Sequence, residues 1–312
     1  LRFLAQCTDK EQYGDYMAIV LLDEMNLAHV ELYFAEFLSK LEERRGKVKD
    51  KVPSVEVKLG GGLEPYRLKM YRNVLWTGTM NQDETTKSLS DKVLDRGIVI
   101  NFPRPTSLRS RTKMKDKEQY RNRVLLQYST WRSWVPKSIA FEGKQRERIE
   151  KYRGIVDQIN NLLEKVGRAL GHRVWQSIEY YIANYPTVLS AQNEISRMVD
   201  EQRLEKGDMT GELAHAMRNA FEDQIVQKIM PKLRGIETSG RGEEQLHAIQ
   251  ALLDSEDFGS LDDDFNNAME LGYGQFMWSS AKYLENDEVI DTVTESEMYS
   301  DEMLYDENTE NQ

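Results

Sequence analysis

Residues 17–26 read MAIVLLDEMN, six apolar residues followed at once by two adjacent carboxylates. A continuous apolar run with β-branched side chains is typical of a strand buried on both faces of a parallel sheet. Open α/β sheets bind their ligands at the carboxyl ends of such strands. The stretch therefore predicts a buried strand that delivers Asp23 and Glu24 to the ligand-binding edge of a sheet.

An apolar strand that ends in Asp-Glu is a Walker B pattern. In that chemistry Asp23 is predicted to hold Mg²⁺ through water, and the metal neutralises charge on the β- and γ-phosphates. Glu24 is predicted to orient and deprotonate the attacking water. An acidic turn or helix start after a buried strand would give the same pattern by chance. The residues after Glu24 must decide between a Walker B element and a chance acidic turn.

The segments downstream complete a predicted α/β region over residues 1–105. Residues 27–45 have the apolar spacing of an amphipathic helix. Residues 54–70 predict a hairpin around three consecutive glycines. Residues 73–79 predict a second buried strand and residues 98–102 a short third one. Together these elements indicate part of a parallel sheet.

Beyond residue 105 the periodicity becomes helical, which predicts an all-α domain over residues 106–284. Helices are expected at 119–134, 145–170, 174–184, 212–233 and 243–253, and a loop at about 257–267. Residues 285–312 contain eleven Asp or Glu and no Lys or Arg. This acidic tail is predicted to be disordered.

The composition bounds the class of protein. The formal net charge of −11 belongs to the tail, whereas residues 104–123 carry about +6 and would contact phosphates or form a solvated connector. The single cysteine, Cys7, excludes an internal disulfide framework, and the four His offer no zinc-ligand spacing. No apolar run approaches the roughly 18 residues of a membrane span. We therefore expect a soluble, cytoplasmic protein with no structural metal and no membrane partner.

Five elements in chain order resemble the McrB-type branch of the dynein-related AAA+ NTPases. They are DEMNLA at 23–28, the amphipathic helix, WTGTMN at 76–81, DETT at 83–86 and LSDKVLDR at 89–96. Two later segments, GHRV at 171–174 and QKIMPKLRG at 227–235, are similar to parts of that family's helical lid. The resemblance covers about residues 15–255. It implies the second half of an AAA+ parallel-sheet core followed by an all-α lid domain.

The resemblance implies roles for two asparagines. Asn81 matches sensor I, which holds the attacking water or the γ-phosphate through its amide, and a neutral amide can both donate and accept there. Asn26 matches a residue that orients Glu24 in the nucleotide site. Asn81 could also be a turn residue that ends a strand, and Asn26 could cap a helix.

The resemblance also implies roles for two arginines. Arg96 matches the arginine finger that reaches the γ-phosphate bound to a neighbouring subunit, where a planar guanidinium can bridge two oxygens. Related proteins often have consecutive arginines here, whereas this sequence has one, which could instead pair with Asp91 or Asp95. Arg173 matches sensor II, although an arginine at a helix start could equally form a surface salt bridge.

One required element does not occur in the sequence. No G-x-x-x-x-G-K-[ST] loop, which cradles phosphates with backbone N–H groups and a lysine, is present, and the glycines at 60–62 do not substitute for it. The opening residues LRFLAQC lack both an initiator Met and a signal-peptide pattern. We expect the loop and any DNA-reading domain to lie upstream or in a separate reading frame. The chain alone is then expected to bind nucleotide weakly or not at all.

By resemblance the complete protein is expected to hydrolyse GTP or ATP with Mg²⁺ as a hexameric ring. The ring would recruit an McrC-like nuclease and translocate DNA in defence against foreign genomes. One alternative is a MoxR-like or dynein-related ATPase that remodels proteins, which shares the Walker B and sensor I elements. The other is a truncated, catalytically inactive scaffold.

Overall fold

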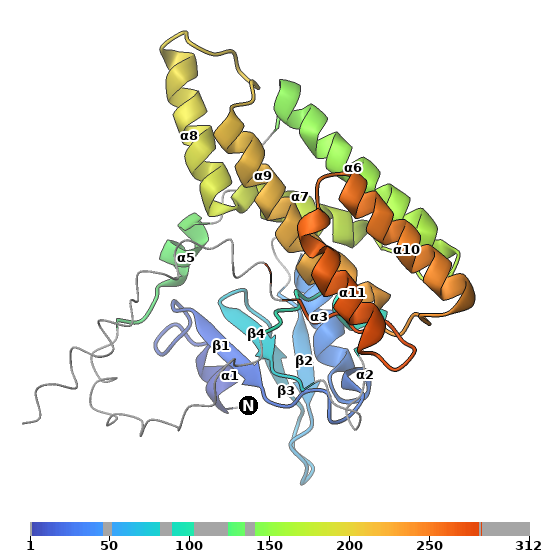
Figure 1. Ribbon diagram of the computed structural model, residues 1–312. Coiled ribbons are helices and arrows are strands. Elements are labelled where there is room, and N and C mark those ends of the chain that lie inside the picture. The colour runs from blue at the N-terminus through green and yellow to red at the C-terminus, as the bar shows by residue number, and fades with distance from the viewer. Residues whose placement is uncertain are drawn as a thin grey trace, which may run out of the picture.

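The computed structural model describes residues 2–45, 52–81, 89–102, 124–134, 141–280 and 282. Figure 1 shows the strands gathered with α1–α3 at one end, whereas the long helices α6–α11 pack together at the other. The predicted motif at 83–86, the basic segment at 104–123 and the acidic tail at 285–312 lie outside the described residues.

The strand predicted before Asp23 and the strand predicted before Asn81 pair with each other. β1 (Ala18–Leu22) lies parallel to β4 (Val74–Gly78), with Leu22 opposite Gly78. Both strands are confirmed as apolar runs that adopt β structure. Their parallel pairing brings their two carboxyl ends to the same edge.

The burial of β1 differs from the prediction. Ala18 is buried against Val74 and next to α1 (Arg2–Gln6), but the side chains of Ile19 and Leu21 on the opposite face are 64% and 59% exposed. The prediction of a strand buried on both faces is therefore wrong for the described part of the chain. No described residue covers that second face.

The hairpin is confirmed. β2 (Ser54–Val57) pairs antiparallel with β3 (Tyr66–Lys69). The three glycines at 60–62 all have positive φ angles, between 61° and 77°, which residues with a side chain rarely adopt.

The helix predicted at 27–45 is divided in two. α2 (Val30–Tyr33) and α3 (Ala35–Arg45) are separated at Phe34, whose φ of −114° and ψ of 7° leave the helical region. The Phe34 ring contacts Phe37 at 5.0 Å and Trp76 at 5.4 Å between centroids. This aromatic cluster fixes the start of α3 against β4.

The short strand predicted at 98–102 is not formed. The chain instead makes the short helix α4 (Asp91–Leu94) and then runs along the helical part. The backbone N–H of Val99 donates to the carbonyl of Gln227 at 3.3 Å, and the side-chain Nδ2 of Asn101 donates to the carbonyl of Ser280 at 3.2 Å. A strand needs backbone hydrogen bonds to a neighbouring strand, and here the backbone N–H of Val99 bonds to the helical part instead.

The remaining elements of the described chain are helices. In order they are α5 (Tyr128–Trp134), α6 (Gly143–Glu164), α7 (His172–Asn184), α8 (Pro186–Asp200), α9 (Gly211–Gln224), the π-helix η2 (Ile225–Ile229), the 3-10 helix η3 (Met230–Leu233), α10 (Gly240–Ser255), the 3-10 helix η4 (Gly259–Leu261) and α11 (Asp262–Glu270). Pro186 begins α8, since proline is compatible with a first helical turn. The loop predicted at about 257–267 is wrong, because these residues contain η4 and most of α11.

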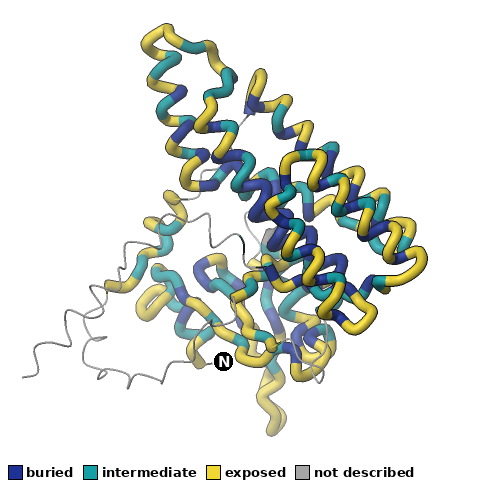
Figure 2. Tube along the Cα trace, viewed as in Figure 1, coloured by how far each residue is buried: buried dark blue, intermediate teal, exposed yellow. Residues whose placement is uncertain are grey.

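The main hydrophobic core lies among these helices. Figure 2 shows buried residues running along α9 and the helix faces turned toward it. Phe221, Ile178 and Leu163 are fully buried there. Within the described ranges, no helix combines the length and apolar character needed to cross a membrane.

Candidate functional site

The carboxyl ends of β1 and β4 are joined by one hydroxyl. Thr79, the first residue after β4, donates from Oγ1 to Oδ1 of Asp23 at 2.5 Å and accepts from the backbone N–H of Glu24 at 2.9 Å. Backbone hydrogen bonds continue beyond the strands, from Thr79 N to Leu22 O and from Met25 N to Thr79 O, both at 2.9 Å. The two carboxylates predicted from the sequence therefore lie beside the segment that leads to Asn81.

Asn26 holds the segment after β4 in place. It is 2% exposed, and its Nδ2 donates to the backbone carbonyl of Asn81 at 2.8 Å. The N-cap of α2 is His29, so the interpretation of Asn26 as a helix cap is wrong. Asn26 instead ties the loop after β1 to the loop after β4, which brings Asp23, Glu24, Asn26 and Asn81 into one constellation.

Glu24 has an unusual backbone conformation. Its φ is +50°, in the left-handed region that side-chain-bearing residues adopt at a cost of order 1–3 kcal/mol. Hydrogen bonds fix it there, since its N–H donates to Thr79 and its carbonyl accepts from Leu27 N at 3.1 Å. Such conformations cluster at functional sites.

The site offers hard oxygen donors at the surface. Asp23, Glu24 and Asn81 are all exposed, so they lie at the protein surface. Mg²⁺ in proteins usually takes one or two carboxylates and completes its shell with waters and substrate phosphates. The described residues contain no cluster of three or more His, Cys, Asp or Glu suited to a metal ion. The donor set fits a magnesium ion shared with phosphates, and not an ion held by protein alone.

The two predicted arginines share one carboxylate on α3. Arg96 Nε lies 3.5 Å from Glu42 Oε2, and Arg173 Nε lies 3.2 Å from Glu42 Oε1. The alternative pairing of Arg96 with Asp91 or Asp95 is not what the structure has, because both of those carboxylates contact Lys232. Arg173 lies at the start of α7, and its contact with Glu42 is the salt bridge that was the alternative to a sensor II role.

The ion pairs of both arginines go to α3. Among the described residues, Arg96 and Arg173 pair with Glu42, and neither pairs with Asp23 or Glu24. Val93, three residues before Arg96, belongs to the cluster against which Leu22 and Met25 pack. The structure therefore joins the two arginines on one carboxylate and forms no ion pair between them and the strand-end carboxylates.

Sequence reasoning missed Thr79, Glu42, Lys228 and Lys232. Thr79 stands inside the segment 76–81 and directly follows a strand, so its position signalled a hydroxyl at the sheet edge. Glu42 is one of several charged residues on the outer face of α3, and only the folded contacts distinguish it.

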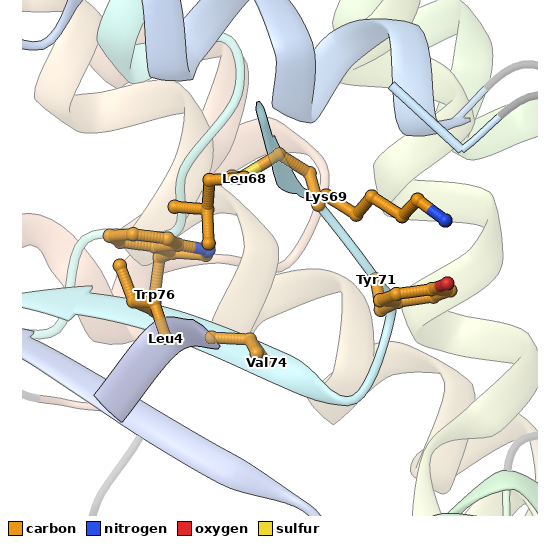
Figure 3. A pocket seen from close by; sticks show the side chains of 7 residues that line it. Leu4, Leu68, Lys69, Tyr71, Val74 and Trp76 are labelled. Atoms are coloured by element: carbon orange, nitrogen blue, oxygen red, sulfur yellow. The ribbon is translucent and has the colours of Figure 1, made fainter. Parts of the chain in front are cut away.

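A small cavity lies elsewhere, between α1, β3 and β4 (Figure 3). It is lined mainly by apolar side chains, among them Leu4, Leu68 and Trp76, and has a volume of about 10 Å³. That is room for about one water molecule. No residue of the strand-end site lines it, and it has no space for a nucleotide.

The comparisons with known proteins concern mainly the helical part. A family model described as "Domain of unknown function (DUF8727)" matches residues 126–286, just over half of the chain. This range runs from α5 to α11 and includes Arg173, but the strand-end site and Arg96 precede it. No curated protein and no solved structure matches the chain.

Asn26→Asp tests the link between the two loops. The substitution keeps the side-chain shape but removes the N–H that donates to Asn81 and buries a carboxyl group. We expect the free energy of unfolding to fall by about 1–3 kcal/mol, measured by urea denaturation. Asn193→Asp, on the exposed side of α8, is the matched control and should change stability by about 0.5 kcal/mol or less. Equal stability of the two variants would contradict the structural role of Asn26.

Proposed function

This chain belongs to the family described as a domain of unknown function, DUF8727, and we propose that it is part of an AAA+ nucleoside triphosphatase of the McrB restriction type. The observation that supports this most is the Thr79 hydroxyl, which joins two parallel strand ends and holds Asp23 and Glu24 beside the Asn81 loop. In this proposal β1 and β4 belong to the second half of an AAA+ sheet, and α6–α11 form the lid.

Each side chain at the strand ends then has a distinct task. One oxygen of Asp23 accepts from Thr79, which fixes the carboxylate that would hold Mg²⁺ through water. Mg²⁺, when bound, would neutralise charge on the β- and γ-phosphates. Glu24 accepts a proton from the attacking water, and its fixed backbone reduces the cost of aligning it. The exposed amide of Asn81 donates to a γ-phosphate oxygen or accepts from that water.

The proposal requires a phosphate-binding loop from outside these 312 residues, because none of the G-x-x-x-x-G-K-[ST] form occurs within them. The exposed Ile19 and Leu21 on β1 are compatible with further sheet-covering elements, since parallel sheets are normally covered on both faces. GTP and ATP serve the proposal equally well.

The arginines keep their assigned roles in this proposal. Arg96 and Arg173 both pair with Glu42, and among the described residues neither pairs with Asp23 or Glu24. In the proposal Arg96 is an arginine finger that acts in trans, and Arg173, which shares its carboxylate, is the sensor II candidate. A finger in trans fits a homo-oligomeric ring such as a hexamer.

In the McrB-type proposal the ring works with an McrC-like nuclease subunit on DNA. The protein-remodelling ATPase would use the same strand-end chemistry, and DNA separates the two. Turnover that DNA stimulates supports the restriction-type motor, whereas turnover that an unfolded protein stimulates and DNA does not supports the remodelling ATPase.

Glu24→Gln tests the water-activating role. In the product of the full reading frame that contains this sequence, we expect GTP or ATP hydrolysis to fall by a factor of about 10² or more, since an amide cannot take the proton. Nucleotide binding, measured by titration calorimetry, and ring assembly, measured by light scattering, should persist. Glu64→Gln, an exposed glutamate in the hairpin, is the matched control. Unchanged hydrolysis in the Glu24 variant would reject its role, and the absence of any wild-type hydrolysis would favour the inactive scaffold.

Mixed rings test the finger. Arg96→Ala subunits and Glu24→Gln subunits are each expected to be inactive alone. If Arg96 acts across an interface, mixing them creates some junctions with an intact Glu24 on one side and an intact Arg96 on the other. Hydrolysis should then rise above either pure sample. No recovery in rings shown by mass spectrometry to be mixed would count against action in trans.

A further inference from the structure

Two buried lysines of the helical part hold the turn that carries Arg96. Lys228 Nζ donates to the backbone carbonyls of Leu94 at 3.0 Å, Asp95 at 2.9 Å and Gly97 at 2.5 Å. Lys228 is only 3% exposed. An ammonium has three N–H donors, and these three carbonyls match them in number. Arg96 lies between the second and third of the carbonyls.

The second lysine binds the carboxylates of the same turn. Lys232 Nζ lies 3.3 Å from Asp91 Oδ1 and also contacts the Asp95 carboxylate. Lys232 is 2% exposed. Both ends of α4 are therefore bound, the first residue by Lys232 and the carboxyl end by Lys228.

Both lysines belong to irregular helical turns. Lys228 belongs to the π-helix η2 and Lys232 to the 3-10 helix η3, and Pro231 between them cannot donate an N–H to the helix. Both side chains nevertheless reach the same turn. Apart from the partly buried Pro231, the two elements are buried, so the lysines cannot turn to solvent. π-helical turns are rare and occur often at functional sites.

The two lysines and α4 stabilise each other. A buried ammonium is costly unless it is partnered, and the turn supplies those partners. In return, α4 has only four residues, too few for a stable helix on its own. A cation at its carboxyl end satisfies carbonyls that have no partner within the helix.

The other side of α4 is held by the strand part. The Ser90 amide donates to Glu31 Oε1 at 3.2 Å, and hydrogen bonding to Ser90 lowers the pKa of Glu31. Val93 packs against Val30 and Phe34. α4 is therefore a bridge between the two parts of the molecule, and the lysines set its end nearest Arg96.

We infer that Lys228 and Lys232 are positioning residues that fix the turn from Asp95 to Gly97 and thereby set where Arg96 points. The catalytic consequence rests on the proposed function, but the positioning itself does not. A change in the helical part would reach Arg96 through these two side chains.

Amide hydrogen exchange on this chain tests the positioning. The amides of Asp95, Arg96 and Gly97 donate to carbonyls of α4, so they exchange slowly while the turn is held. In Lys228→Met and in Lys232→Met we expect these amides to exchange roughly tenfold faster, with α6 amides unchanged. Lys151→Met, which removes an exposed ion pair with Glu256, should leave the turn as in the wild type. Unchanged exchange at the turn in the folded lysine variants would overturn the inference.

Asp95→Asn decides the matter if the lysine variants do not fold. It removes the charge of one of the two carboxylates that Lys232 contacts, on the partly exposed side of the contact. We expect faster exchange at the turn with the helical core intact. Exchange identical to the wild type would again overturn the inference.

A catalytic measurement separates this inference from the proposed function. In the full-length product, Lys228→Met should lower kcat with little change in KM, and mixing with Glu24→Gln subunits should restore turnover as for Arg96→Ala. Lack of recovery in confirmed mixed rings would contradict positioning of a finger. If the wild type hydrolyses no nucleotide but the exchange results hold, the proposed function fails and the positioning stands.

Discussion

The parallel pairing of β1 with β4 is the constraint on which the site depends. Because Leu22 lies opposite Gly78, the first residues beyond both strands are forced together at one edge. Thr79 then joins them through a single hydroxyl that donates to Asp23 and accepts from Glu24. A shift of one residue in this register would turn Thr79 to the other face of the sheet and remove the link.

The helical part contributes by a different physical means. Its core is apolar, yet the ammonium groups of Lys228 in η2 and Lys232 in η3 are buried. The cost of that burial is offset by the carbonyls and carboxylates of α4, so a four-residue helix becomes an ordered element. Arg96 is held between this contact and Glu42.

The sequence predicted local elements better than long-range contacts. Continuous apolar runs indicated β1 and β4, and the glycines at 60–62 indicated the hairpin. The strand expected at 98–102 was wrong because the backbone N–H of Val99 bonds to Gln227, a residue far along the chain. For the site, the side chains of Asp23, Glu24 and Asn26 could be placed from their position after a strand. The pairing of Arg96 and Arg173 on Glu42 could not, because it depends on how α3, α4 and α7 meet.

The most direct test of the proposed metal–nucleotide site is paramagnetic broadening of backbone amide signals by Mn²⁺, added with a non-hydrolysable nucleoside triphosphate to the product of the full reading frame that contains this sequence. The account predicts that the signals of Asp23, Glu24, Thr79 and Asn81 broaden together at the lowest Mn²⁺ concentrations, and that Asp23→Asn abolishes this. Sharp signals at these four positions, while amides elsewhere in the folded chain broaden, would contradict it.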